Sequence, residues 1–145
     1  MKRLVLLFSV LFPMSILSAC CKDAINNILN SIQNKNYTEM ELLLKDRPNL
    51  SCKNYDGITV LGSAVRNRDV EAIRILLDAG ADPNLVDGGV TPLYIAALMD
   101  CEKCATEIIA AGGKISADEV QIRNLKMYNH TSSDFWNKIL GGISP

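Results

Sequence analysis

Histidine and tryptophan each occur once in this sequence, and neither sign of charge is in excess. His130 is therefore the only candidate for the base of a Ser-His-Asp or Cys-His arrangement, and its Asn-His-Thr-Ser-Ser context is typical of a turn. The sequence has no G-x-S-x-G elbow, phosphate-binding loop or dinucleotide fingerprint. With a formal net charge of −1 and no basic patch, nucleic acid is not an expected partner. We expect no catalysis, no cofactor and no metal.

The chain does contain two stretches that repeat an earlier part of it. Residues 56–64 align with residues 88–96, and residues 75–82 align with residues 107–114, both at an offset of 32 residues. A fixed period of this length is typical of stacked supersecondary units.

The shared positions give each unit a turn, a short helix, a second helix and another turn. Gly57 or Gly89 supplies the positive φ of a tight turn, and Thr59 or Thr91 can cap the helix that follows. The second helix, residues 70–77 in the first of the two units, is amphipathic and is followed by a glycine in the usual C′ position.

Two segments resemble the signatures of the ankyrin repeat. Residues 91–96 read TPLYIA, similar to T-P-L-H-x-A, and residues 76–84 read LLDAGADPN, similar to LLxxGADxN. The resemblance implies an all-α ankyrin-repeat solenoid of about four helix pairs with short β-turn or hairpin connections. Val60 replaces the proline, and Gly62 and Tyr94 replace the histidine. We expect these departures to weaken local hydrogen bonding without changing the fold.

At least three units are normally needed to bury a solenoid core, so the flanks of the two repeats are expected to be folded. Apolar residues at helical spacing precede them, a capping-box pattern at 116–119 follows them, and a last helix over 134–140 contains Trp136 as a core residue of the cap. The predicted division of a single domain over 20–145 is a degenerate first repeat at 22–53, repeats at 54–86 and 87–115, and a C-terminal cap at 116–145. The first repeat has four apolar residues at helical spacing, Ile25, Ile28, Leu29 and Ile32, and Met40, Leu42, Leu43 and Leu44 follow them.

Residues 1–19 have the layout of a secretory signal, with two basic residues, an apolar run and small residues at the end. The run is too short to span a bilayer as a helix. Leu17-Ser18-Ala19-Cys20 resembles the bacterial lipobox, in which the cysteine is lipidated and becomes the mature N-terminus, whereas ordinary signal cleavage favours a small residue where Leu17 stands. We expect a lipid anchor on Cys20 and a periplasmic location. The residue after the lipidated cysteine is Cys21 and not aspartate, which by resemblance to lipoprotein sorting favours an anchor in the outer membrane. We expect the first helix to open near Asp23, so almost no tether would separate the anchor from the folded domain.

Four cysteines remain after lipidation, namely Cys21, Cys52, Cys101 and Cys104, and the sequence leaves their pairing open. The C-x-x-C spacing of the last two is compatible with thiol redox chemistry. In the repeat alignment, however, Cys104 falls opposite the inward-facing Ala72, which favours packing or a possible local disulfide between Cys101 and Cys104. A metal site would need all four cysteines together, and the first two belong to a different repeat.

Ankyrin repeats generally bind partners through the turn tips and the exposed face of each first helix. Ile95 and Met99 share one helix face, and an exposed apolar pair there would imply a partner. The alternative is that the C-terminal cap covers the pair or that the shortened hairpin rotates it inward. The predicted partner-binding residues are Asn54, Tyr55, Asp56, Ile58, Ser63, Arg66, Asn67, Asp87, Val90, Ile95, Leu98 and Met99.

Small ankyrin-like lipoproteins of the periplasm resemble immunity proteins, which protect bacteria from phospholipase effectors delivered by type VI secretion. The resemblance implies that this chain binds and neutralises such a toxin, with a secreted lipase or phospholipase as its partner. Two alternatives stay open. One is a general periplasmic scaffold, for example for stress-related enzymes, and the other is a C-x-x-C redox protein.

Overall fold

The residues that the structure describes form three helix pairs in a row and one further helix. The computed structural model describes residues 14–115 and 134–141, and within these ranges the fold is all-helical, as predicted. The pairs are α1 (Met14–Gln33) with α2 (Tyr37–Lys45), α3 (Val60–Arg66) with α4 (Val70–Asp78), and α5 (Pro92–Leu98) with α6 (Glu102–Ala110), and the further helix is α8 (Asp134–Gly141).

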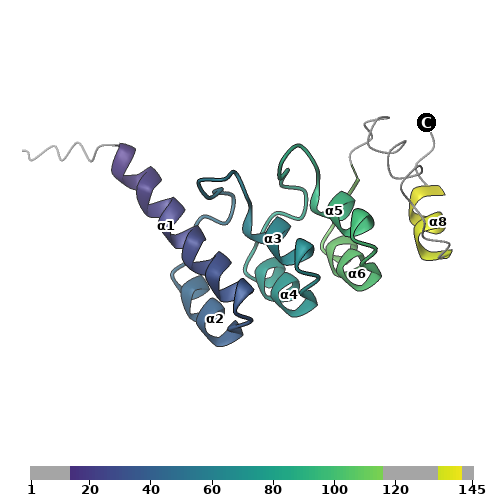
Figure 1. The fold of residues 1–145 in the computed structure, drawn as a ribbon, viewed down its shortest axis with the longest axis horizontal. Helices are drawn as coiled ribbons and strands as arrows, with labels where there is room; N and C mark the ends of the chain where they lie inside the picture. The colour runs from purple at the N-terminus through teal and green to yellow at the C-terminus, as the bar shows by residue number, and fades with distance from the viewer. Residues whose placement is uncertain (1–13, 116–133, 142–145) are drawn as a thin grey trace, which may run out of the picture.

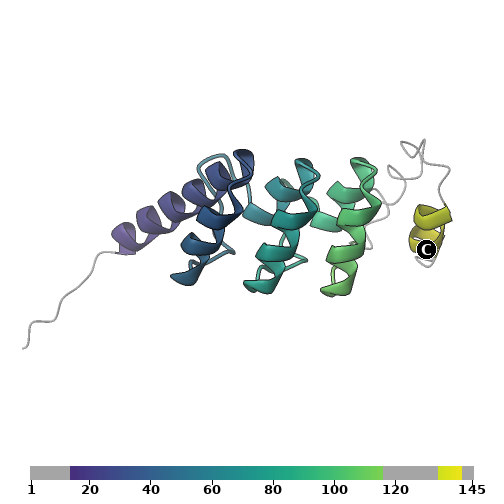
Figure 2. The ribbon, with the colours of Figure 1, turned by 90° about the horizontal axis from the view of Figure 1, so that it is seen from below.

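The paired helices lie in two layers (Figures 1 and 2). Helices α1, α3 and α5 form the first layer, α2, α4 and α6 form the second, and each helix contacts its pair partner. In Figure 1 the two hairpins between the pairs rise on the side of the first layer. Helices α3 and α5 begin after a hairpin, and every helix of the first layer ends at the tight turn into the second. We call the side with these tight turns the turn edge and the side with the hairpins the hairpin edge.

One apolar core runs through all the pairs. The four apolar residues predicted at helical spacing in the first repeat are buried, and so are the inward-facing positions of the later repeats. Trp136 of α8 belongs to the same cluster, so α8 extends the core beyond the third pair. The largest fully buried side chains are Trp136, Ile25, Ile28, Ile32, Met40, Leu61, Ile73, Leu76, Ile108, Val60 and Val65.

Residues with positive φ recur at equivalent positions of the repeats. One position lies in the tight turn between the two helices of each pair, and the other follows the second helix. Gly80 and Gly112 take the second position without a steric penalty, whereas the first repeat has Arg47 there with φ of 49°. The turn position is held by Lys35, Arg68 and Asp100.

The shorter period of the last repeat arises at a hairpin tip. In the first hairpin, Asn54 and Ile58 close a five-residue tip by a 3.0 Å hydrogen bond from the Asn54 N–H to the Ile58 carbonyl. In the second hairpin, Asp87 and Val90 form the equivalent bridge one residue sooner, with a 2.8 Å hydrogen bond. The missing residue therefore shortens the tip and leaves the helix pairs unchanged.

Helix α1 begins at Met14, and the expected start near Asp23 was wrong. Residues 21–25 align with the first hairpin tip, but they contain neither glycine nor proline, so nothing breaks the helix where the later repeats turn. Residues 1–13 of the predicted signal, the capping box at 116–119 and His130 lie outside the described residues. Among the helices that the structure describes, none combines the length and the apolar character needed to cross a membrane.

Candidate functional site

Exposed side chains of the first layer collect at the turn edge. Arg66, Asn67 and Leu98 are exposed, Leu98 to 49%, and Met99 is half-buried. The equivalent residues of α1, 33 and 34, are exposed amides. The turn edge therefore changes from polar in the first repeat to apolar in the third, and a partner that uses it meets an apolar anchor at one end.

Exposed cations lie along the turn edge of the first two repeats. Arg68 and Lys35 are both exposed, and they occupy the turn position with φ of 51°. Neither was predicted as a site residue, although their equivalence follows from the repeat register. We define the turn-edge surface as Arg66, Asn67, Arg68, Leu98 and Met99.

Asp87 was predicted to contact a partner, and this was wrong, because its side chain is only 2% exposed. Its Oδ2 accepts hydrogen bonds from the backbone N–H and the hydroxyl of Thr59, both at 3.2 Å, and from Arg66 Nη1 at 2.8 Å. A buried carboxylate needs such donors to offset its lost hydration. Asp87 thus joins the second hairpin to the start of α3 and orients Arg66.

Gly62 makes room for this carboxylate. A Cβ at position 62 would collide with Asp87 Oδ2 and lie 2.9 Å from Thr59 Oγ1. The hydroxyl of Thr59 also caps α3, since it accepts the Gly62 N–H at 3.0 Å. We had expected that glycine at position 62, in place of the histidine of the ankyrin signature, would weaken local hydrogen bonding. This expectation was wrong, because the absence of a side chain lets the Asp87 carboxylate accept hydrogen bonds there.

The first hairpin tip presents two exposed side chains, Tyr55 and Asp56. Asn54 and Ile58 are half-buried, and the Asn54 Oδ1 accepts the backbone N–H of Asp56 at 2.9 Å and of Ile58 at 2.8 Å. These two predicted site residues therefore build the tip. Lys22 of α1, which the sequence did not single out, places its Nζ 4.7 Å from the centre of the Tyr55 ring.

Ile95 does not form an exposed pair with Met99, as had been expected, because it is only 4% exposed. It belongs to the core cluster that also contains Trp136, which agrees with the alternative that the C-terminal cap buries this end of the stack. Val90 and Met99 are partly buried against the same core, and Ser63 is half-buried. Of the apolar residues predicted on α5, Leu98 is the one that stays exposed.

Helix α8 is held at the turn edge of the third repeat. The Trp136 Nε1–H donates to Asp100 Oδ1 at 2.9 Å, and the Trp136 side chain is fully buried. Phe135 contacts the Trp136 ring edge to face, with ring centres 5.0 Å apart. Trp136 is therefore a core residue of the stack.

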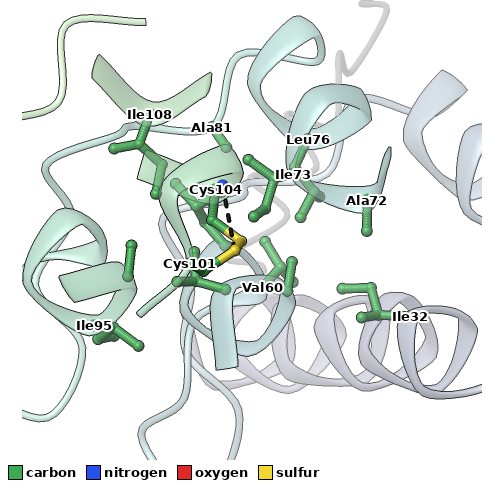
Figure 3. Packing of buried hydrophobic residues seen from close by; sticks show 14 of the residues in the cluster. Ile32, Val60, Ala72, Ile73, Leu76, Ala81, Ile95, Cys101, Cys104 and Ile108 are labelled. Carbon is green, nitrogen blue, oxygen red and sulfur yellow. Dashed lines mark hydrogen bonds between the residues drawn. A yellow bond between two sulfur atoms is a disulfide. The ribbon is translucent and has the colours of Figure 1, made fainter. Parts of the chain in front are cut away.

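Two disulfides are present, Cys21–Cys52 and Cys101–Cys104, with Cα atoms 6.4 and 5.2 Å apart. The first joins α1 to the loop before the first hairpin. The second lies among buried side chains in Figure 3, and the Cys101 sulfur accepts the Cys104 N–H at 3.3 Å. Cys101 thereby caps α6 in the way that Asp69 caps α4, which is a structural role.

The caps also connect neighbouring repeats. The Tyr37 hydroxyl of α2 donates to the Asp69 carboxylate at 3.0 Å, and partial burial and this hydrogen bond raise the pKa of Tyr37. On the second layer, Arg74 pairs with Glu107 of the next repeat at 3.1 Å. The hydrogen bond to Glu107 is the main cause of the raised pKa of Arg74.

A surface hollow of about 370 Å³ opens between the ends of α2 and α4. None of the predicted partner-binding residues lines it. Within the described ranges, no group of three or more His, Cys, Asp and Glu side chains is placed to hold a metal ion. The lining residues of the hollow are Leu44, Arg47, Pro48, Leu50, Asp78 and Ala79.

Comparison with known proteins gives a match to the family model described as ankyrin repeats, in three copies, over residues 19–119. A putative ankyrin repeat protein of fowlpox virus, FPV222, is 30% identical over 94 residues, which is 64% of this chain and 13% of the viral protein. The ankyrin repeat domain-containing protein SAT10 of Stachybotrys chartarum is 30% identical over 84 residues, which is 58% of this chain and 4% of the fungal protein. The matches thus span a small part of either relative.

Proposed function

Because this chain belongs to the ankyrin-repeat family, whose scaffolds are generally non-enzymatic modules that bind proteins, we propose that it binds a toxic effector and neutralises it. The effector is a phospholipase, and the protein acts as its immunity partner in the periplasm. A lipid anchor on Cys20 holds it beside the lipids under attack. The anchor and the toxin come from the resemblances of the sequence, and the binding surface comes from the fold.

The observation that carries the binding proposal is the exposed Leu98 at the turn edge. Leu98 is half exposed, the next residue Met99 is partly buried, and Arg66 and Arg68 are exposed on the same edge of the preceding repeat, so this surface offers a small apolar centre with a polar rim. Arg66 and Arg68 would face acidic groups of the partner, while Leu98 would enter an apolar pocket. The partner surface that fits is an apolar depression with carboxylates around it.

The burial of Cys101 and Cys104 supports binding over the redox alternative. Cys104 is fully buried and Cys101 nearly so, which leaves little sulfur surface for an attacking thiolate. The general scaffold alternative uses the same surface, and it differs only in the partner that the surface binds.

The test is inhibition of a phospholipase effector by the soluble domain from Cys21 onward, measured as lipid hydrolysis in vesicles. We expect the parent domain to inhibit stoichiometrically and Leu98→Asp to weaken inhibition at least about tenfold, because a central apolar anchor commonly contributes more than 1 kcal/mol. Leu42→Asp is the matched control, since Leu42 is an exposed leucine of the second layer.

Two results would count against the proposal. If the parent domain leaves lipid hydrolysis unchanged, the immunity function fails. If Leu98→Asp and Leu42→Asp inhibit equally well, the toxin is bound elsewhere and the turn-edge surface is not the site.

A further inference from the structure

We propose that the hairpin edge lies against the bilayer, so that the hairpin tips contact the membrane and the tight turns contact the protein partner. This orientation rests on the lipid anchor of the proposed function and goes beyond it. The side chains that meet the lipid are those of Lys22, Lys53, Tyr55 and Val86.

The first disulfide places the anchor beside the first hairpin. Cys20 precedes Cys21 directly, and Cys21 is bonded to Cys52, with 6.4 Å between the Cα atoms. Asn54, which closes the tip, follows Cys52 by two residues. An acyl chain on Cys20 therefore enters the bilayer next to the hairpin, and the disulfide prevents this end of α1 from separating from it.

The side chains around that point suit a membrane interface. Tyr55 is 67% exposed, and the Lys22 ammonium lies over its ring. Tyrosine is enriched at headgroup level, and lysine places its ammonium among lipid phosphates while its stem packs on apolar groups. Val86, on the second hairpin, is 42% exposed, and Figure 1 shows both hairpins on the same side of the stack.

The charge of this edge is balanced, so the covalent anchor dominates its attraction to the membrane. Asp23 and Asp56 are exposed beside the two lysines. More than one acyl chain gives stable anchoring, and a contact of aromatic and apolar side chains next to the anchor favours one orientation of the domain. The side chains of the hairpin edge thus determine how the domain is oriented on the bilayer, while the acyl anchor on Cys20 accounts for most of its affinity for the membrane.

The turn edge is then separated from the membrane, because the hairpins rise beyond the first layer in Figure 1 and the tight turns lie at the far ends of the first-layer helices. A first-layer helix of seven residues, such as α3, spans about 10 Å from the hairpin to the turn. Leu98 and Arg68 therefore face the periplasm, where a secreted protein can reach them. Tyr55 and Asp56, predicted as partner-binding residues, contact lipid in this arrangement.

The experiment compares lysine accessibility in the full-length protein, either in detergent or reconstituted into vesicles of phosphatidylethanolamine and phosphatidylglycerol. A water-soluble amine-reactive ester labels the lysines, and mass spectrometry of the digest measures each site. Relative to detergent, we expect labelling of Lys22 and Lys53 to fall about threefold or more against Lys35 and Lys103, because headgroups cover the hairpin edge. Lys35 and Lys103 are exposed at the turn edge and correct for protein enclosed inside vesicles.

The same digest distinguishes a failure of the lipid anchor from a failure of the proposed orientation. An unacylated Cys20 peptide overturns the anchor, and the orientation falls with it. An acylated Cys20 peptide with equal loss of labelling at all four lysines overturns the orientation alone and leaves the hairpins free for a protein. A Tyr55→Asp, Val86→Asp variant should restore labelling of Lys53 in vesicles, and unchanged protection would show that these side chains do not hold the edge against lipid.

Discussion

Single side chains fix the contact between the second and third repeats. Asp87 reaches from one hairpin to the first turn of the preceding helix pair, where Gly62 leaves space for its carboxylate. The same oxygen binds Thr59 and Arg66, so helix capping and the position of an exposed guanidinium depend on one buried group. The chemistry of the turn-edge surface is therefore coupled to the packing beneath it.

Gly62→Ala should reduce the free energy of unfolding by about 2 kcal/mol, because the added methyl group displaces a carboxylate that several hydrogen bonds hold in place. Urea unfolding followed by circular dichroism measures the change. Asp87→Ala alone should also destabilise, since it removes the acceptor of the Thr59 N–H.

The double variant is the control for this explanation. With Asp87 already truncated, the methyl group at position 62 meets no carboxylate, so the two losses should sum to clearly more than the loss in the double variant. Additive losses would mean that Gly62 is required for some other reason.

Residues at the end of the stack were harder to predict than those within it. The repeat alignment assigns Ile95 to the same helix face as exposed or half-buried residues of earlier repeats, and periodicity alone predicts exposure. Ile95 instead belongs to the core cluster that also contains Trp136 of α8, and the earlier repeats used in the alignment have no such helix after them. Asp87 was misjudged for a related reason, since a polar residue at a turn tip is ordinarily exposed and its hydrogen-bond partners lie 21 to 28 positions away.

At the scale of helices, the turn into each second helix carries much of the contact between pairs. Tyr37 begins α2, and its hydroxyl binds the carboxylate that caps α4. This contact makes the stability of the stack sensitive to alkaline pH. Partial burial, the hydrogen bond to Asp69 and the Asp69 charge all disfavour the ionised form, so the folded state raises the pKa of Tyr37 above the 10.0 of an ordinary tyrosine.

The stabilisation from Tyr37 should be complete below pH 10.0 and decline as the pH rises through the higher pKa of the folded state. Tyr37→Phe should cost about 1 kcal/mol at neutral pH, the usual net value of one hydrogen bond, and its stability should fall less steeply above pH 10.0. Urea unfolding of both proteins at several alkaline pH values measures this. The other tyrosines are common to both proteins, so parallel curves would rule out the Tyr37–Asp69 contact as the cause.

The helices of the repeats followed from the sequence, whereas the start of α1 did not. Threonine caps, glycines after the second helices and apolar periodicity each have a local physical cause, and the structure has α3 to α6 where they predict. The first repeat has no turn residues at 21–25, and a helix continues through them. The expected helix start lay just before the apolar residues at helical spacing, and that spacing carries no information on how far the helix extends before them.

Taken as a whole, the molecule is a row of units in which each contacts its neighbours. In such a stack, stability is approximately a sum of local terms, and an end unit has a neighbour on one side only. Helix α8 lies at the C-terminal end and is attached through fully buried Trp136 and its hydrogen bond to Asp100. We therefore expect this end to open before the centre.

The single tryptophan makes this opening measurable. In urea, the red shift of Trp136 fluorescence should occur at a lower concentration than the loss of far-ultraviolet circular dichroism, because fluorescence follows α8 and dichroism follows all the helices. Asp100→Ala should move the fluorescence transition to still lower urea and leave the dichroism transition nearly in place. If the two transitions coincide in both proteins, the stack unfolds as one cooperative unit.

The two hairpin tips differ in length by one residue, although the helices of the second and third pairs have the same lengths. Chain length can therefore vary at the tip without a change in the spacing of the stack, since closing a slightly longer loop costs little entropy. For protein engineering, this makes the second tip, at Gly88 and Gly89, a natural point for grafting a foreign recognition loop. The helix pairs would supply the rigid frame for a binding specificity that the native chain does not have.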